Sequence, residues 1–125
     1  MTHSFKDIVA WQKAHAFVIL AYQTTATFPP RETYGLPSQL ERAAVSIAAN
    51  IAEGYRRISK ADKLRLLNIA QSSLEECQYY ILLAKDLQYI DSQQYIALSE
   101  AINCASYFLN AYSKGIKEKT FSSEI

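Results

Sequence analysis

The sequence predicts an all-α protein, an up-down-up-down antiparallel four-helix bundle. Half of the 125 residues are apolar and only three are glycine and three proline, which is too few for an all-β chain with many turns. Apolar residues recur every three or four positions along four stretches, as on one face of a helix. Short connections between such stretches favour antiparallel neighbours. A chain of this length forms a single domain, residues 1–125, with helices expected at about 7–28, 37–54, 60–89 and 92–118.

The first expected helix runs from Asp7, interpreted as its N-cap, to Phe28. It stops there because Pro29-Pro30 follows, and proline disfavours the α conformation of the residue before it. Its expected buried face recurs at steps of three and four and consists of Ile8, Trp11, His15, Val18, Tyr22 and Thr25. On this face His15 is expected to be an interior or interface residue rather than a catalytic base.

The other three helices have recognisable ends. The second is expected to begin at Pro37, whose fixed φ suits a first turn, and to end at Gly54, which we interpret as a left-handed cap. The third begins after Ser59, with Asp62 completing a capping sequence, and the fourth begins after Asp91 in the same way. The fourth carries an uninterrupted apolar seam, formed by Tyr95, Leu98, Ile102, Ala105, Leu109, Tyr112 and Ile116.

Charge is distributed unevenly, although the whole chain carries a net charge of only +1. If the helices alternate in direction, the start of the first helix, the junction between the second and third, and the C-terminus share one end. That end carries ten cations and five anions, and the other carries three cations and seven anions. Helix dipoles explain cations near helix C-termini, but they do not explain Lys60 and Lys63 at the start of a helix. This basic end indicates either an anionic partner or a solvated face.

The sequence predicts no enzyme, no catalytic residue, no metal and no cofactor. A di-iron site of the bundle type needs Glu-x-x-His motifs on two helices, whereas His3 and His15 both lie near the N-terminus without that spacing. Gly-rich phosphate loops, nucleophile turns and Cys/His clusters are absent from the sequence. The alternative is a carboxylate-dependent hydrolase that uses Glu41, Glu53 and Glu75.

The sequence also predicts a cytoplasmic protein that does not cross a membrane. Cys77 and Cys104 fall inside apolar helical patterns, which is typical of reduced, buried thiols. The longest apolar run, residues 16–22, is far shorter than the roughly 20 residues that span a bilayer. The N-terminal residues lack the charged and then apolar organisation of a signal peptide.

The segment from Phe5 to about Tyr89 contains a set of short motifs that would be hard to obtain by chance. They are Trp11-Gln12-Lys13-Ala14, Phe28-Pro29, Tyr34-Gly35-Leu36, Ser46-Ile47, Asn50-Ile51-Ala52-Glu53-Gly54 and Ser73-Leu74-Glu75-Glu76. With these motifs the chain resembles the bacterial four-helix bundle proteins encoded in intervening sequences of 23S rRNA genes. Relatives of that family include the accessory variability determinant of diversity-generating retroelements.

The resemblance implies a homopentamer. The fourth helix has apolar residues outside its main seam and the third has surplus tyrosines, which is typical of a subunit interface. The first and fourth helices are expected to contribute apolar residues to the ring. The expected interface residues are Trp11, Phe108 and Tyr112. At the junction, the matching Asn50 and Glu53 lie one helical turn apart before Gly54. They are expected to hydrogen-bond the backbone where the second helix ends, as a structural clasp.

The expected function is that of a non-enzymatic homo-oligomeric module that associates with RNA or DNA, or acts as a scaffold, through its basic end. Contacts with phosphates give affinity without sequence preference. The candidate nucleic-acid-binding residues are Lys13, Arg56, Arg57, Lys60, Lys63 and Arg65. The alternative is an adaptor for a protein partner such as a reverse transcriptase, which the retroelement relatives are understood to bind.

Overall fold

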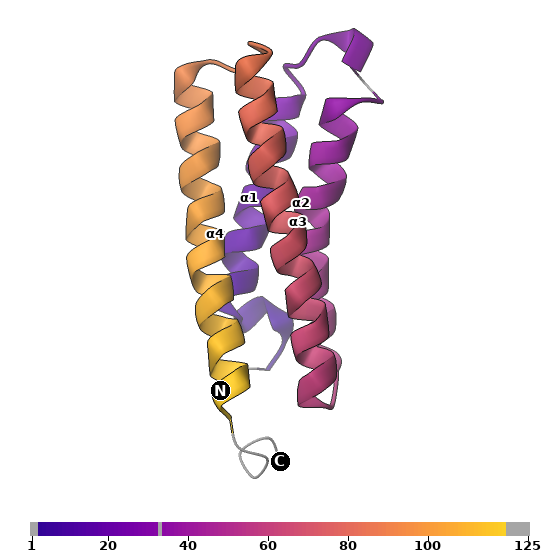
Figure 1. The fold of residues 1–125 in the computed structure, drawn as a ribbon, viewed down its shortest axis with the longest axis vertical. Helices are drawn as coiled ribbons and strands as arrows, with labels where there is room; N and C mark the ends of the chain where they lie inside the picture. Colours follow the sequence, from indigo (N-terminus) through magenta and orange to yellow (C-terminus); the bar gives the residue numbers. More distant parts are fainter. Residues whose placement is uncertain (1–2, 33, 120–125) are drawn as a thin grey trace.

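The computed structural model describes residues 3–32 and 34–119, and these form an up-down-up-down four-helix bundle (Figure 1). The predicted fold class is therefore confirmed. The described elements, in chain order, are η1 (Phe5–Asp7), α1 (Val9–Thr25), η2 (Pro30–Glu32), α2 (Leu36–Arg56), α3 (Lys60–Asp86) and α4 (Ser92–Glu118), of which η1 and η2 are short 3-10 helices.

The helices form a ring in which each one packs mainly against two neighbours. The neighbouring pairs are α1 with α2, α2 with α3, α3 with α4 and α4 with α1, and the α2–α3 pair is the most extensive. We call the end with the start of α1, the α2–α3 junction and the end of α4 the lower end, as Figure 1 draws it. The α1–α2 and α3–α4 connections form the upper end. The expected separation of a basic from an acidic end follows from this topology.

The core is continuous and is supplied by all four long helices. The expected apolar seam of α4 is largely buried. The largest side chains with almost no exposure are Phe17, Leu40, Ile47, Ile51, Leu67, Ile81, Leu98, Ile102 and Leu109.

The expected limits of the first helix were wrong at both ends. Asp7 does not cap α1, because it belongs to η1, where its carboxylate and the Ser4 hydroxyl form a capping box. At the other end α1 stops at Thr25 instead of Phe28. The amides of Thr27 and Phe28 donate to the carbonyls of Thr24 at 3.1 Å and Thr25 at 3.0 Å, so the backbone tightens into turns before Pro29. Proline therefore affects more than the residue directly before it.

The expected buried face of α1 was only partly right, because Ile8, Val18 and Thr25 are buried but the other three expected residues are not. Small residues at 10, 14 and 21 face the core together with Phe17, so α1 can approach its neighbours closely. Trp11 is half-buried, whereas His15 and Tyr22 are exposed. The ring of His15 stacks on that of Trp11, with centroids 4.9 Å apart. The bulky aromatic residues therefore flank the core rather than fill it.

Gly54 is not a left-handed cap. The helix α2 begins at Leu36 and continues through Gly54 to Arg56, and no glycine among the described residues has a positive φ. Instead, Gly54 is buried where α3 begins. A Cβ built on it would lie 3.7 Å from the Leu66 Cβ and 3.8 Å from the Leu67 Cδ2, which is ordinary van der Waals contact.

The ends of α3 and α4 agree with the predictions except at one position. Ser59 caps α3 by accepting a hydrogen bond from the Asp62 amide, and α4 spans residues 92–118, as expected, behind a capping box of Asp91 and Gln94. However, α3 ends at Asp86 rather than 89 because Gln88 takes a φ of 63°. This residue ends the helix in a Schellman arrangement, and the sequence gives no glycine there to signal it.

Glu32 ties the two upper connections together. Its carboxylate accepts a hydrogen bond from the Tyr89 hydroxyl at 2.7 Å, and the ring of Tyr89 packs against Phe28. The Tyr89 hydrogen bond, together with one from the Leu36 amide, lowers the pKa of Glu32. The same contact raises the pKa of Tyr89. The upper end is thus closed by one acidic side chain.

Lys63 closes the lower end. Its amine donates to the carbonyls of Gly54 at 3.2 Å and Tyr55 at 3.0 Å, in the last turn of α2. The amine of Lys60 likewise donates to the carbonyl of Lys119 at 2.9 Å, where α4 ends. Carbonyls at a helix C-terminus lack partners within the helix and carry partial negative charge. On α3 alone, Lys60 and Lys63 are unfavourable, because cations are disfavoured at a helix N-terminus. Antiparallel packing explains them, because it places the C-terminal carbonyls of α2 and α4 beside them.

We expect Gly54→Ala to stabilise the protein by about 0.5–1 kcal/mol, because alanine is the better helix former and the space admits a methyl group. Urea denaturation measures the change in the free energy of unfolding. A loss of stability would contradict the helical assignment of Gly54, since a left-handed cap would be strained by alanine.

We expect Lys63→Met to destabilise the protein by about 1–2 kcal/mol, since methionine keeps most of the aliphatic stem but leaves two carbonyls without their charged donor. Lys114→Met is the matched control, because Lys114 is exposed and its ion pair with Glu118, across 3.9 Å, lies on the surface. Equal free energies of unfolding for the two variants would show that the clasp contributes nothing.

Candidate nucleic-acid interface

Arg56 and Arg57 lie at the tip of the lower end, in the last turn of α2 and directly after it. Both are exposed. Arg57 faces Glu53 across 3.7 Å, with the two side chains 45% and 62% exposed, and such a surface pair contributes little to stability. Arg56 forms no ion pair with any described residue. A phosphate could therefore contact both guanidinium groups without breaking a strong interaction.

The other predicted cations have different surroundings. Lys60 and Lys63 cap neighbouring helices, so their charge is partly used inside the fold. Arg65 pairs with Asp62 across 3.7 Å. Lys13 lies over the Phe108 ring, 6.0 Å from its centroid, between α1 and α4. Of the six candidates, Arg56, Arg57 and Arg65 are exposed, whereas the three lysines are half-buried.

The expected clasp of Asn50 and Glu53 was wrong, and Lys63 performs that role. The Asn50 amide donates one turn back, to the Ser46 carbonyl at 2.8 Å and to its Oγ at 3.1 Å. The Ser73 hydroxyl of α3 donates to the same Ser46 Oγ at 2.8 Å. Asn50 thus belongs to a polar contact that joins α2 to α3. In the sequence, this contact could have been anticipated only from Ser73, a polar residue at a core position of α3.

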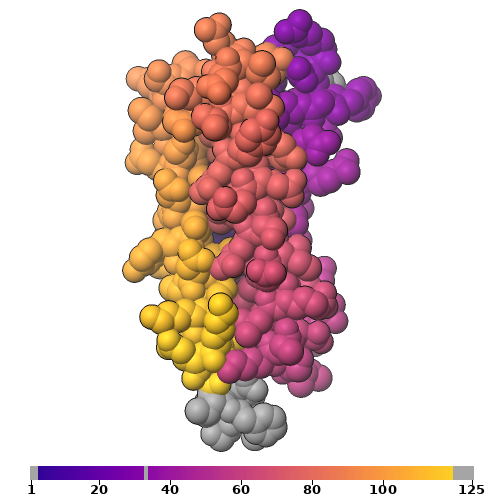
Figure 2. All heavy atoms as spheres, viewed as in Figure 1, coloured from indigo at the N-terminus to yellow at the C-terminus, as the bar shows by residue number. Residues whose placement is uncertain are grey.

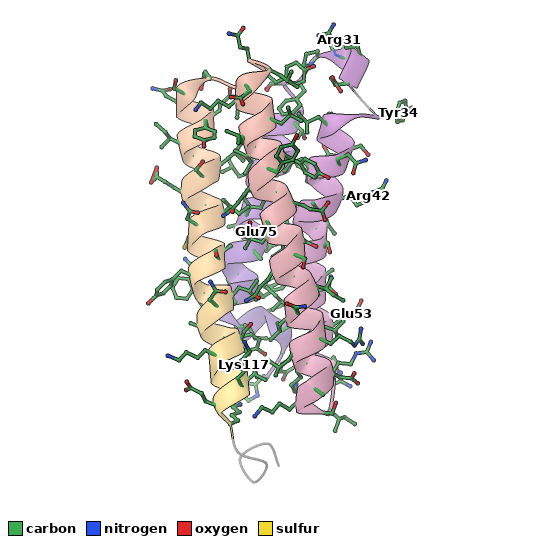
Figure 3. All side chains as sticks on the ribbon, viewed as in Figure 1. Arg31, Tyr34, Arg42, Glu53, Glu75 and Lys117 are labelled. Carbon is green, nitrogen blue, oxygen red and sulfur yellow. The ribbon has the colours of Figure 1, made fainter. Side chains whose placement is uncertain are left out.

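The carboxylates of the alternative hydrolase do not gather. Glu41 lies near the upper end, where it accepts a hydrogen bond from Thr25 at 2.6 Å. Glu53 lies in the lower half, and Glu75 lies on α3 at mid-height (Figure 3). Within residues 3–32 and 34–119, no group of three or more His, Cys, Asp or Glu side chains could hold a metal ion.

The charge map of the two ends matches the expected topology. Figure 3 places Arg31 and Arg42 in the upper half and Lys117 in the lower half. The lower end holds ten described cations and four described anions, because Glu124 lies outside the described residues. The electrostatic potential of these side chains is therefore positive at the lower end, although the whole chain is nearly neutral.

A depression of about 360 Å³ lies between the start of α1 and α4. Phe108, Ala111 and Tyr112 line it from α4, opposite Ile8 and neighbouring residues. Trp11 is not part of it. Lys13 faces Phe108, and residues two apart lie about 200° apart around a helix, so Trp11 lies on the other flank of α1. The three expected interface residues therefore do not form one patch.

The two thiols are unpaired and differ in exposure. Cys77 is fully buried in the core, and burial raises the pKa of its thiol to about 12. Cys104 is half-buried on α4. No helix of the described chain is long and apolar enough to span a bilayer.

Comparison with known proteins agrees with the fold and with the motifs. Among curated proteins, none matches the chain. A crystal structure of a protein with unknown function from the S23 ribosomal protein family of Bacteroides thetaiotaomicron is similar, with a TM-score of 0.78 and 26% sequence identity. The match covers 87% of this chain and 98% of that one. The family model of the 23S rRNA-intervening sequence protein matches residues 6–111. The chain therefore belongs to the 23S rRNA-intervening sequence protein family.

Proposed function

We propose that this protein is a non-enzymatic, self-associating module of the reducing cytoplasm that binds the phosphate backbone of nucleic acid through its lower end. The observation that carries the proposal is the exposed pair Arg56 and Arg57, which protrudes from an end where cations outnumber anions. Guanidinium groups match phosphate geometry and are never deprotonated in proteins. Contacts with phosphates carry no sequence information, so the expected binding is independent of sequence.

Self-association completes the proposal. The resemblance within the family implies a homopentamer, and the α1–α4 depression with exposed Val9 beside it offers an apolar contact surface. In a ring of copies, several lower ends would face one nucleic acid. Weak contacts then act together, because the second and later contacts form at high local concentration. A nearly neutral chain can bind in this way.

A protein partner is the second candidate. Ile58 follows Arg57 and is 95% exposed. An exposed apolar side chain next to basic ones suits a protein surface with acidic and apolar groups better than it suits a phosphate backbone. A reverse transcriptase is one such partner that the resemblance implies. Loss of partner binding in Ile58→Ser, with nucleic-acid binding unchanged, separates the two candidates.

We expect replacement of both Arg56 and Arg57 with glutamine to weaken retention of single- and double-stranded oligonucleotides and to lower the salt slope by about one unit per lost phosphate contact. Arg42→Gln is the control, because Arg42 is exposed in the upper half. Filter retention between 50 and 200 mM salt measures both. If wild type retains neither form near 50 mM salt, where such contacts are strongest, the lower end does not bind nucleic acid.

We expect Ala111→Glu to dissociate the oligomer, because burying an unpaired carboxylate in a subunit contact is costly. Ala111 is exposed in one chain, so the monomer should still fold, whereas Phe108→Glu disturbs a residue that packs on the core. Light scattering gives the mass, and circular dichroism confirms folding. A wild-type monomer at all concentrations would contradict self-association, and a wild-type dimer would contradict the pentamer.

A further inference from the structure

The groove between α3 and α4 contains a second polar feature that is separate from the arginine tip. Figure 2 shows this face, with the two helices side by side and the seam between them hollowed. In the lower part of the groove lies a depression of about 310 Å³, which we call the lower groove site. Its polar side chains are Arg65, Asn68 and Gln71 from α3 and Ser113 and Lys117 from α4.

The residues that line the lower groove site have the composition of an anion site. Arg65 and Lys117 supply two cations and none of the lining residues is acidic. Asp62 pairs with Arg65 across 3.7 Å, with the side chain of Arg65 57% exposed, so this weak surface pair leaves the guanidinium accessible to a ligand. Asn68 and Gln71 supply neutral amide donors, and Gln71 is held by a hydrogen bond of 2.7 Å to Asn110. Tetrahedral oxyanions accept several such donors at once.

Ser113 supplies an independent indication of a ligand. The residue is only 5% exposed, and its Oγ is buried with no hydrogen-bond partner among the described residues. An unsatisfied buried hydroxyl destabilises a fold, so native structures rarely keep one without a reason. Ser113 is also one of the residues that line the lower groove site, so its hydroxyl is a donor without a partner beside the two cations.

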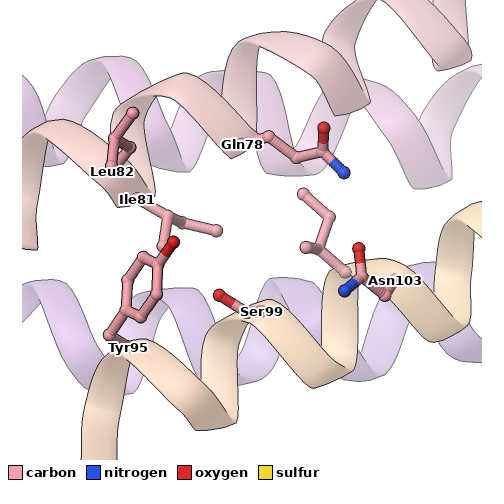
Figure 4. Close-up of a pocket in the computed structure, with 7 residues that line it drawn as sticks. Gln78, Ile81, Leu82, Tyr95, Ser99 and Asn103 are labelled. Atoms are coloured by element: carbon pink, nitrogen blue, oxygen red, sulfur yellow. The ribbon is translucent and has the colours of Figure 1, made fainter. Parts of the chain in front are cut away.

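The upper part of the same groove provides an internal comparison. There a depression of about 340 Å³ is lined by Gln78, Tyr95, Ser99 and Asn103 with three aliphatic residues (Figure 4). It has amides and hydroxyls but no charged lining residue. The two cations and the unpartnered hydroxyl therefore distinguish the lower site from a groove that is merely polar.

We propose that the lower groove site binds a phosphate group. Its volume of about 310 Å³ lies within the roughly 300–1,000 Å³ of ligand pockets, so it has room for a phosphate group. The source is either the backbone of a nucleic acid or a small phosphate compound. Only the first of these sources rests on the proposed function.

The test uses inorganic phosphate, adenosine monophosphate and a short single-stranded oligonucleotide as probes of the full chain. Nuclear magnetic resonance of the Asn68 and Gln71 side-chain amides reports on the site directly. Saturable shifts of these signals are expected with at least one phosphate probe. Lys117→Gln and Ser113→Ala should each weaken binding, by about tenfold where a charge-assisted hydrogen bond is lost. Lys114→Gln removes the same charge from the same end of α4 outside the site and should leave the affinity unchanged.

Ser113→Ala also separates ligand binding from a structural role. Because the hydroxyl has no partner in the unliganded protein, this variant should be as stable as wild type or more stable, while it loses affinity. Absence of shifts with all three probes, or wild-type affinity in both Lys117→Gln and Ser113→Ala, overturns the site. Oligonucleotide binding that is unchanged in these variants, without binding of the small probes, overturns the site but leaves the proposed function intact. Phosphate binding without oligonucleotide binding supports the site and contradicts the proposed function.

Discussion

The contact of the Lys63 amine with the last carbonyls of α2 fixes the lower end of the bundle. It joins the first turn of α3 to the last turn of α2, beside the buried Gly54. Because Lys63 holds the last turn of α2 against α3, the exposed Arg56 and Arg57 extend into solvent from a fixed position. Placement of the arginine tip therefore depends on a lysine that is not itself available for a ligand.

Basic side chains tie the helices together at the lower end of the bundle, and an acidic side chain ties the connections together at the upper end. The two end surfaces therefore differ in charge. Below, lysines satisfy helix C-termini, and above, Glu32 joins the two connections through Tyr89. Fold stability and charge separation thus have the same origin in antiparallel packing, where each helix C-terminus lies beside the N-terminus of its neighbour. A chain with a net charge of only +1 can then present a strongly basic end without a basic composition.

Helix number, order and direction could be predicted from periodicity and capping residues, because these are local signals that all agree. Details that depend on neighbouring helices could not. The aromatic residue Trp11 has the right spacing for the core, but small residues fill that face because the helices approach closely. Gly54 was expected to be a cap, yet it lies inside α2. The role of Lys63 appears only when α2 lies beside it. The unpartnered Ser113 hydroxyl has no sequence signal at all.

The most direct test of the account is a map of backbone amide shifts during titration with a short oligonucleotide at about 50 mM salt, where phosphate contacts are strong. The account predicts that the largest shifts fall on residues 56–68 and 113–117, on the arginine tip and the lower groove site. Shifts centred instead on the upper end, around Arg31 and Arg42, or the absence of any shift, would contradict it.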